Sequence, residues 1–132
     1  MTDETDRRKR GLQVLAEMLG EDFAKATEQR INSGGFGSAL AGVAADLSFA
    51  DVWGRDGLDR RARSLVVIGV LIALESKSEL KHHFHIGMNH GLTPQELEEV
   101  VLQALPYAGV SKAGPALGVL REVLAEAKSG GH

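Results

Sequence analysis

Four of the five histidines in this 132-residue chain fall between positions 82 and 90, at His82, His83, His85 and His90. Glu79 precedes His83 by four residues, so on a helix the carboxylate and the imidazole would stack on one face. A carboxylate at this spacing can fix the tautomer of an imidazole and raise its basicity, as general acid–base chemistry requires. The same pair is also common on helix surfaces, where it carries no chemistry.

A metal site is a second interpretation of the histidine cluster. Glu79, His82 and His85 follow one another at three-residue intervals and contain one Glu-x-x-His fragment. Di-iron bundles need a second such fragment and two further glutamates, and the His-Glu-x-x-His zinc motif is absent too. We therefore predict no metal ligand, and metal analysis of the protein would decide this alternative.

Arginines gather just before the most apolar segment of the chain, at Arg55, Arg60, Arg61 and Arg63. Cations at a helix start oppose the helix dipole, while a guanidinium suits bidentate recognition of a carboxylate. One of these arginines is therefore a candidate for binding an acidic substrate, and a solvated helix start is the alternative. The single tryptophan, Trp53, can line a pocket or simply pack.

Apolar residues recur at helical spacing almost throughout, which predicts an all-α fold of six or seven helices. One helix, from 60 to about 74, is apolar on every side from Leu65 onward, which implies burial all round, in a core or an oligomer interface. Gly69 within it suggests a closely passing backbone. The expected face of a helix from Ser38 to near Trp53 carries Leu40, Val43, Ala44 and Leu47. Expected helix starts and capping boxes involve Ser38, Asp59, Ser76 with Glu79, Thr93 with Glu96, and Ser111; expected stops are Gly20, Gly91 and Pro106.

Length and composition predict one domain over 1–132, with a core at 6–127 and a flexible tail at 128–132. The net charge is −3, and acids offset the one basic run, Arg7–Arg10, so we expect no nucleic-acid partner. The absence of cysteine excludes disulfides and thiol chemistry. The apolar run is too short to span a bilayer and no signal core is visible, so we expect no membrane partner and a cytoplasmic location.

Several segments together are similar to one known family. They read V-W-G-R-D-G-L-D-R-R-A-R-S-L (Val52–Leu65), E-L-K-H-H (Glu79–His83), N-H-G-L-T-P-Q-E-L-E-E-V-V-L-Q (Asn89–Gln103), Y-A-G-V (Tyr107–Val110) and R-G-L-Q-V-L-A-E-M-L-G (Arg10–Gly20). On these segments the chain resembles the carboxymuconolactone decarboxylase family over about residues 7–125. The resemblance implies an alkyl-hydroperoxidase-like helical fold, a homotrimer or homohexamer with pockets near subunit contacts, and no cofactor.

Redox relatives in the same superfamily carry a glutamate, a Cys-x-x-Cys pair and a histidine. In this chain those positions are Ser64, then Ser76 and Glu79, then His83. Without thiols, peroxidase chemistry is excluded, and the Glu-Leu-x-x-His pattern is similar to the decarboxylase branch.

The family reaction removes CO2 from 4-carboxymuconolactone and leaves a dienolate. The protein must then stabilise an oxyanion and deliver a proton to carbon. The resemblance thus implies a carboxy-lyase acting on a small lactone or unsaturated acid, with His83 as proton donor held by Glu79. The implied substrate-binding residues are Trp53, Arg55, Ser64 and His85.

The chain departs from the decarboxylase pattern at two positions that matter here. His85 stands where an arginine is typical, which weakens the case for a multiply anionic substrate. Ser111 replaces a proline. Isomerisation or elimination on a related enolisable substrate, or non-catalytic binding of a small molecule by an oligomer, therefore stay open as alternatives. The sequence indicates no role for His82 or His90.

Overall fold

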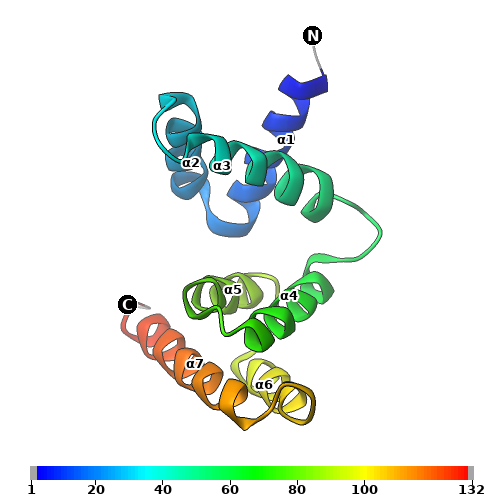
Figure 1. The fold of residues 1–132 in the computed structure, drawn as a ribbon, viewed down its shortest axis with the longest axis vertical. Coiled ribbons are helices and arrows are strands. Elements are labelled where there is room, and N and C mark those ends of the chain that lie inside the picture. Colours follow the sequence, from blue (N-terminus) through cyan, green and yellow to red (C-terminus); the bar gives the residue numbers. More distant parts are fainter. Residues whose placement is uncertain (1–2, 131–132) are drawn as a thin grey trace. The chain divides into compact units, whose positions relative to one another are not determined.

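A computed structural model describes residues 3–130, and every regular element in that range is a helix. The elements are α1 (Asp3–Leu19), α2 (Glu21–Ser33), α3 (Ser38–Val43), η1 (Ala44–Trp53), α4 (Arg60–Leu74), α5 (Lys77–Asn89), α6 (Pro94–Ala108) and α7 (Val110–Gly130) (Figure 1). Because η1 continues α3 without a break, the predicted all-α fold of six or seven helices is confirmed.

The chain divides into two compact units, residues 1–58 and residues 59–132. The first unit contains α1 to η1, and the second contains α4 to α7. That both units together form one domain stays a prediction. Among residues 3–130, no helix is long and apolar enough to cross a membrane.

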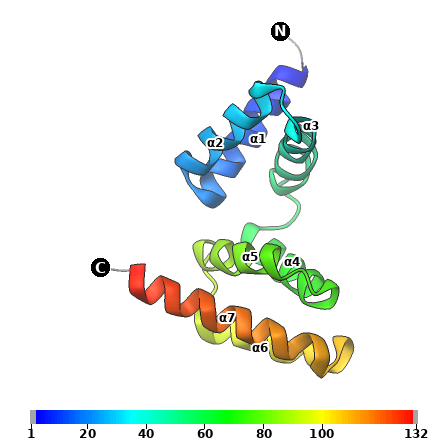
Figure 2. The ribbon, with the colours of Figure 1, turned by 60° about the vertical axis from the view of Figure 1, so that its left-hand side comes forward.

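In the amino-terminal unit, α1 packs against both η1 and α2 (Figure 2). The closest approach is at Gly11, where an added Cβ would lie 2.1 Å from the carbonyl oxygen of Ala45. Only a residue without a side chain permits this contact. η1 is a π-helix, as the 3.0 Å hydrogen bond from the Gly54 amide to the Phe49 carbonyl shows, five residues back.

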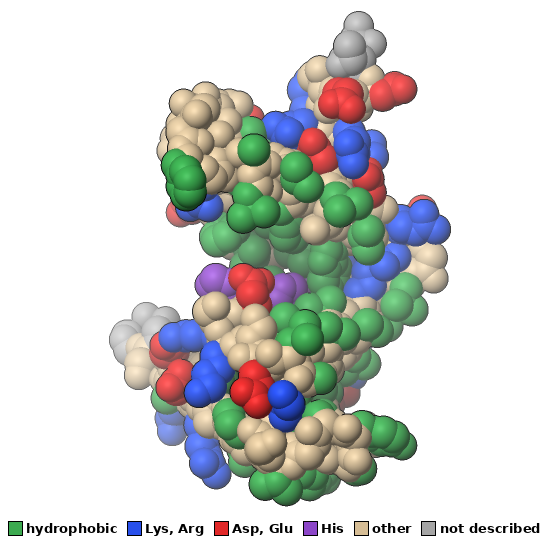
Figure 3. Space-filling view, viewed as in Figure 1, with side chains coloured by type: hydrophobic (Ala, Val, Ile, Leu, Met, Phe, Trp, Pro, Cys, Tyr) green, Lys and Arg blue, Asp and Glu red, His purple; other side chains and the backbone are tan. Residues whose placement is uncertain are grey.

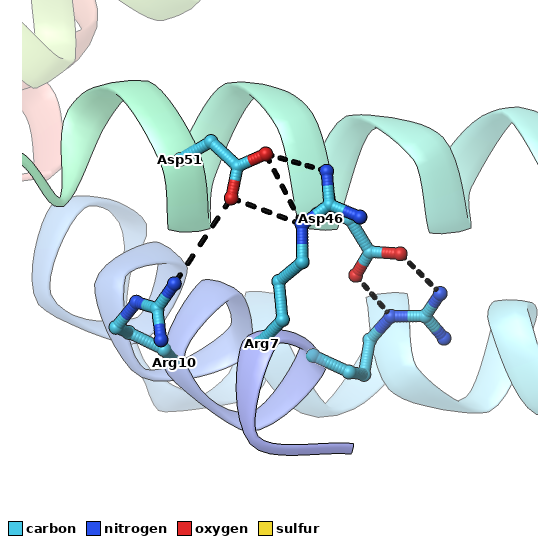
Figure 4. Close-up of polar contacts among 5 residues, drawn as sticks. Arg7, Arg10, Asp46 and Asp51 are labelled. Atoms are coloured by element: carbon cyan, nitrogen blue, oxygen red, sulfur yellow. Dashed lines mark hydrogen bonds and ion pairs between the residues drawn. The ribbon is translucent and has the colours of Figure 1, made fainter. Parts of the chain in front are cut away.

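Ion pairs join α1 to η1 alongside this contact (Figure 4). Arg7 Nη2 lies 2.5 Å from Asp51 Oδ2, and Arg8 Nε lies 2.7 Å from Asp46 Oδ1. Arg10 contacts Asp51 at 4.0 Å. Hydrogen bonds from Arg8 and Arg7 lower the pKa values of the Asp46 and Asp51 carboxyls. Three arginines of the basic run are thus engaged with the two carboxylates of η1.

The apolar face expected for the helix between residues 38 and 53 is exposed within the chain. Leu40, Val43 and Leu47 are each more than half exposed, and Figure 3 shows hydrophobic side chains among polar ones on the visible surface of α3 and η1. The helix instead turns small residues toward α1, because the close approach at Gly11 leaves no room for larger ones. Ser38 is not the predicted cap, since Gly37 occupies that position with a φ of 88°.

In the carboxyl-terminal unit, α4 packs against α5 and α6, and α7 packs against α5 and α6. In both ribbon views α6 and α7 run side by side (Figures 1 and 2). Their shared core consists of apolar side chains that are almost completely buried, among them Ile68, Ile72, Leu80, Phe84, Leu97, Leu120 and Val123. This core fixes which side of α5 faces inward.

Two of the predicted helix starts in this unit are confirmed. Asp59 caps α4, and Thr93 with Glu96 forms a complete capping box at α6. The capping box predicted for Ser76 and Glu79 is wrong. Ser76 occupies the cap position of α5, but its ψ of 79° is not the extended conformation of a capping serine and its side chain makes no cap bond. Glu79 therefore has no capping role.

Helix ends near the carboxyl terminus also differ from the prediction. Pro106 lies inside α6, which continues to Ala108; in the last turn, a missing amide costs only one helical bond. Ser111 is not a cap, because α7 begins one residue earlier, after Gly109 with a φ of 96°. Residues 128–130 belong to α7, and 131–132 lie outside the described residues, so the flexible tail stays a prediction.

The apolar helix α4 is buried on one side only within this chain. Val66, Val70 and Leu74 are 59%, 50% and 69% exposed. Their four-residue spacing makes one continuous line, which we call the α4 stripe. At Gly69, an added Cβ would meet no atom within 4 Å, so the expected close backbone is not found among the described residues. The prediction of burial all round is therefore wrong for the single chain.

Candidate active site

The predicted acid–base pair lies on one face of α5. Glu79 Oε2 and His83 Nε2 are 4.0 Å apart, with side chains 58% and 13% exposed. Leu80 and Phe84 face the core from the neighbouring positions of α5, which leaves Glu79 and His83 at the edge of that core. At 4.0 Å the two groups attract each other electrostatically when His83 is protonated, but the distance is too long for a hydrogen bond.

Burial governs the charge of His83. It lowers the pKa of the imidazole below its usual value because the charged ring loses solvation. The Glu79 carboxylate opposes this shift, and positive charge on His82 or His90 adds to it. At neutral pH the resting site therefore holds an uncharged ring beside an exposed carboxylate. A bound anion would favour protonation of that ring.

A second polar contact joins α4 to the end of α5. Ser64 is fully buried on α4, and its Oγ lies 2.8 Å from Nδ1 of His90. His90 follows His83 by seven residues, close to two helical turns, so the two rings share a side of the helix. Burial lowers the pKa of His90, the charge of Arg60 lowers it further, and a hydrogen bond with the Arg60 backbone opposes both.

Sequence reasoning placed Ser64 in the site but missed its partner. The seven-residue spacing from His83 to His90 could have indicated this partner, because on a helix it places His90 on the same side as Glu79 and His83. The contact itself depends on how α4 packs on α5, which no local pattern specifies. The structure thus adds His90 to the residues of this face.

His85 and His82 have surroundings that differ from those of His83. His85 is directed toward α7, where its Nε2 is 3.6 Å from Glu126 Oε1, and Lys81 Nζ contacts the same carboxylate at 2.7 Å. His82 is exposed. The structure therefore brings His85 to Glu126 rather than to His83, and its substrate-binding role stays a prediction.

The two remaining predicted residues belong to the amino-terminal unit. Trp53 is the last residue of η1 and is 8% exposed, and Arg55 follows in the turn after it. The roles of Trp53 and Arg55 in binding a substrate stay predictions.

The face around His83 can move protons. Figure 3 shows histidine side chains gathered over α5 with an acidic side chain beside them. Helices α4 and α5 carry two imidazoles with lowered pKa values, a buried hydroxyl and a carboxylate. Over the described part of the chain, no three His, Asp or Glu side chains come together as metal ligands.

The all-α fold and the positions of Ser64, Ser76, Glu79 and His83, in a sequence without cysteine, agree with the resemblance described above. The chain belongs to the carboxymuconolactone decarboxylase family, whose model matches residues 39–122. That match spans α4, α5 and α6 completely, and so includes every residue of the His83 face.

Two relatives are similar over nearly the whole chain. A 4-carboxymuconolactone decarboxylase of Acinetobacter baylyi is 37% identical over 123 residues, 93% of this chain and 90% of the relative. A nitrosuccinic acid decarboxylase, npaB of Metarhizium robertsii, is 30% identical over 124 residues, 92% of this chain and 85% of the relative. The predicted family and the predicted class, a decarboxylase, are confirmed at that level. The substrate and the roles of individual residues stay predictions.

Proposed function

We propose that this protein is a cofactor-independent carboxy-lyase that removes CO2 from a small lactone or unsaturated carboxylic acid, with His83 as the proton donor. The observation that supports the role of His83 most directly is its burial beside Glu79, on the face that also carries Ser64 and His90. The two decarboxylase relatives support the type of reaction.

The chemistry needs a group that is uncharged at rest and protonated when the substrate is bound. Breaking the bond to CO2 leaves an electron pair, which a conjugated carbonyl group takes up as a dienolate, and carbon then receives a proton. An acidic substrate next to His83 offsets the burial that keeps the ring neutral, so the ring takes a proton as the substrate binds. The imidazolium can then protonate carbon as the dienolate collapses.

The names of the two relatives suggest which acids to test. 4-Carboxymuconolactone and nitrosuccinic acid each place a carboxyl group where an electron-withdrawing group, a lactone or a nitro group, can accept the electron pair left by CO2. We propose an acid of this general type as the substrate. The histidine at position 85, in place of the arginine typical of the branch, leaves open which of them this protein prefers.

The test is to incubate the protein with each acid and follow CO2 release together with the ultraviolet absorbance of the substrate. Turnover with release of one CO2 per substrate, lost in His83→Gln, is the expected result. An absorbance change without CO2 would instead support isomerisation or elimination. Binding without any turnover would support a non-catalytic small-molecule-binding protein, and either result would overturn the proposal.

We further propose that the protein is a homo-oligomer, a trimer or hexamer, that buries the α4 stripe. Three apolar side chains at least half exposed on one helix favour a partner surface over water. Val70→Glu should shift the sedimentation of the protein toward the monomer, whereas Gln103→Glu, an equal change of charge at an exposed position of α6, should not. A wild-type monomer would contradict this proposal. A cytoplasmic location stays a prediction.

A further inference from the structure

We propose that Ser64 and His90 form a positioning pair for His83: Ser64 holds the His90 ring in place, and that ring sets the conditions under which His83 accepts a proton. This inference rests on the proposed role of His83 as a proton donor. It gives a function to a histidine that the sequence left without one.

The first observation is the way in which the Ser64 hydroxyl is used. A buried hydroxyl costs free energy unless it is hydrogen-bonded. Thr27, another buried polar residue, satisfies its hydroxyl within its own helix, at 2.9 Å from the Phe23 carbonyl. Ser64 instead lies 2.8 Å from Nδ1 of His90, at the end of a different helix. The Ser64 hydroxyl therefore joins two helices, whereas the Thr27 hydroxyl is bonded within one helix.

The second observation is that the His90 ring is fixed from more than one direction. Nδ1 meets Ser64, a hydrogen bond with the Arg60 backbone favours the charged ring, and Nε2 is buried as well. A neutral imidazole carries its hydrogen on one nitrogen, chosen by the hydrogen bonds around it. Ser64 and the Arg60 backbone therefore restrict the orientation of the His90 ring, while the serine hydroxyl, which can donate or accept, fits either tautomer.

The third observation is that the charge of His90 acts on His83. Positive charge on His90 lowers the pKa of His83. The other charged groups that act on the pair are Glu79 and His82 on α5 and Arg60 on α4. From α7, Glu126 engages Lys81 and His85 instead.

These groups make protonation of the pair anticooperative. Burial lowers the pKa values of both rings, so both gain their protons below the ordinary range of a histidine. In that range a neutral His90 allows His83 to accept a proton, and a charged His90 opposes it. The titration of His83 should therefore extend over a wider pH range than that of an isolated group.

His90→Asn separates the proton of His90 from its structural contact. The asparagine amide can occupy the place of Nδ1 and still bond Ser64, but it cannot be protonated. The titration of His83 is followed by nuclear magnetic resonance of its ring carbon and proton in the full-length protein. We expect a narrower curve with a higher midpoint in His90→Asn than in the wild type. His85→Asn, the same exchange on the side of α5 toward α7, should leave the His83 curve unchanged.

Ser64→Ala provides a second variant should His90→Asn not fold. It retains the imidazole but removes its anchor, and it should also alter the breadth of the His83 titration. If the wild type turns over one of the two acids, the alkaline limb of its kcat/KM profile should move to higher pH in His90→Asn, because His83 then keeps its proton to higher pH.

The outcomes separate this inference from the proposed function. A His83 titration identical in the wild type and in every folded variant would show that the pair is only structural, whatever the activity. Unchanged kcat/KM profiles in an active enzyme would overturn the positioning role and leave the decarboxylase proposal intact. A wild type without turnover on either acid would overturn the proposed function, while the resonance titration would still decide whether the pair acts on His83.

Discussion

The sequence pairs Glu79 with His83 as catalytic residues, but the structure predicts very unequal effects when each is replaced. His83 is 13% exposed, and as a proton donor it would interact directly with the reacting carbon. Glu79 is 58% exposed and 4.0 Å from the ring. We therefore expect His83→Gln to remove most of the activity and Glu79→Gln to remove little.

The magnitudes follow from what each contact can contribute. General acid–base catalysis by a positioned side chain contributes typically 10²–10⁴-fold, so we expect His83→Gln to lower kcat by about that factor. An exposed carboxylate at i, i+4 stabilises its partner by about 0.3–0.5 kcal/mol. That free energy corresponds to about a twofold change in rate. The predicted ratio of the two effects is therefore about 50-fold or more.

The assay is the initial rate of CO2 release at saturating substrate for both variants, with Glu28→Gln as a control. Glu28 is an exposed glutamate on α2, so its replacement removes the same charge from a helix other than α5. A loss of 100-fold or more in Glu79→Gln would refute the reasoning. It would mean that the working enzyme closes the 4.0 Å gap into a hydrogen bond that orients His83.

Two further predictions concern stability. Gly11→Ala should lower the free energy of unfolding in urea by roughly 1–3 kcal/mol, because the new Cβ would lie 2.1 Å from the Ala45 carbonyl oxygen. Gly69→Ala should instead raise it by about 1 kcal/mol, because the new Cβ would meet no atom within 4 Å. Equal effects of the two substitutions would contradict the packing described. The pKa values of His83 and His90 are lowered in the folded state, so the unfolded state binds more protons at acidic pH. The free energy of unfolding should therefore fall as the pH drops below about 6.5. Each ring contributes at most about 1.4 kcal/mol per pH unit to this fall. Urea unfolding of His83→Gln/His90→Gln between pH 7 and pH 5 should show a shallower decline, and a decline as steep as in the wild type would contradict the assignment.

Local signals in the sequence were enough to predict where several helices begin. Asp59 and the Thr93–Glu96 box act through atoms within one turn of the chain, so their residue types suffice. Ser76 and Glu79 have the same residue pattern but no cap bond. The difference lies in the backbone, because Glu75 adopts a left-handed φ of 56° that delivers Ser76 in the wrong conformation, and residue type alone does not predict this.

The inward faces of the helices were harder to predict than their positions. Hydrophobic periodicity assumes that the largest apolar residues face the core of the same chain. Leu40 and Val70 break this assumption, since each is at least half exposed. A close contact such as that of Gly11 with Ala45 is set by the tertiary packing of two helices, and so is the Ser64–His90 bond.

The histidine face makes physical sense for a reaction that begins with an acid and ends with a proton on carbon. A ring that burial keeps neutral can take up the proton it must deliver when the anionic substrate binds. Glu79 alone, exposed and distant, sets the timing of that protonation only weakly. A second buried ring, anchored by Ser64, adds its own charge to this balance, and the titration of His83 in the His90→Asn protein measures that contribution directly.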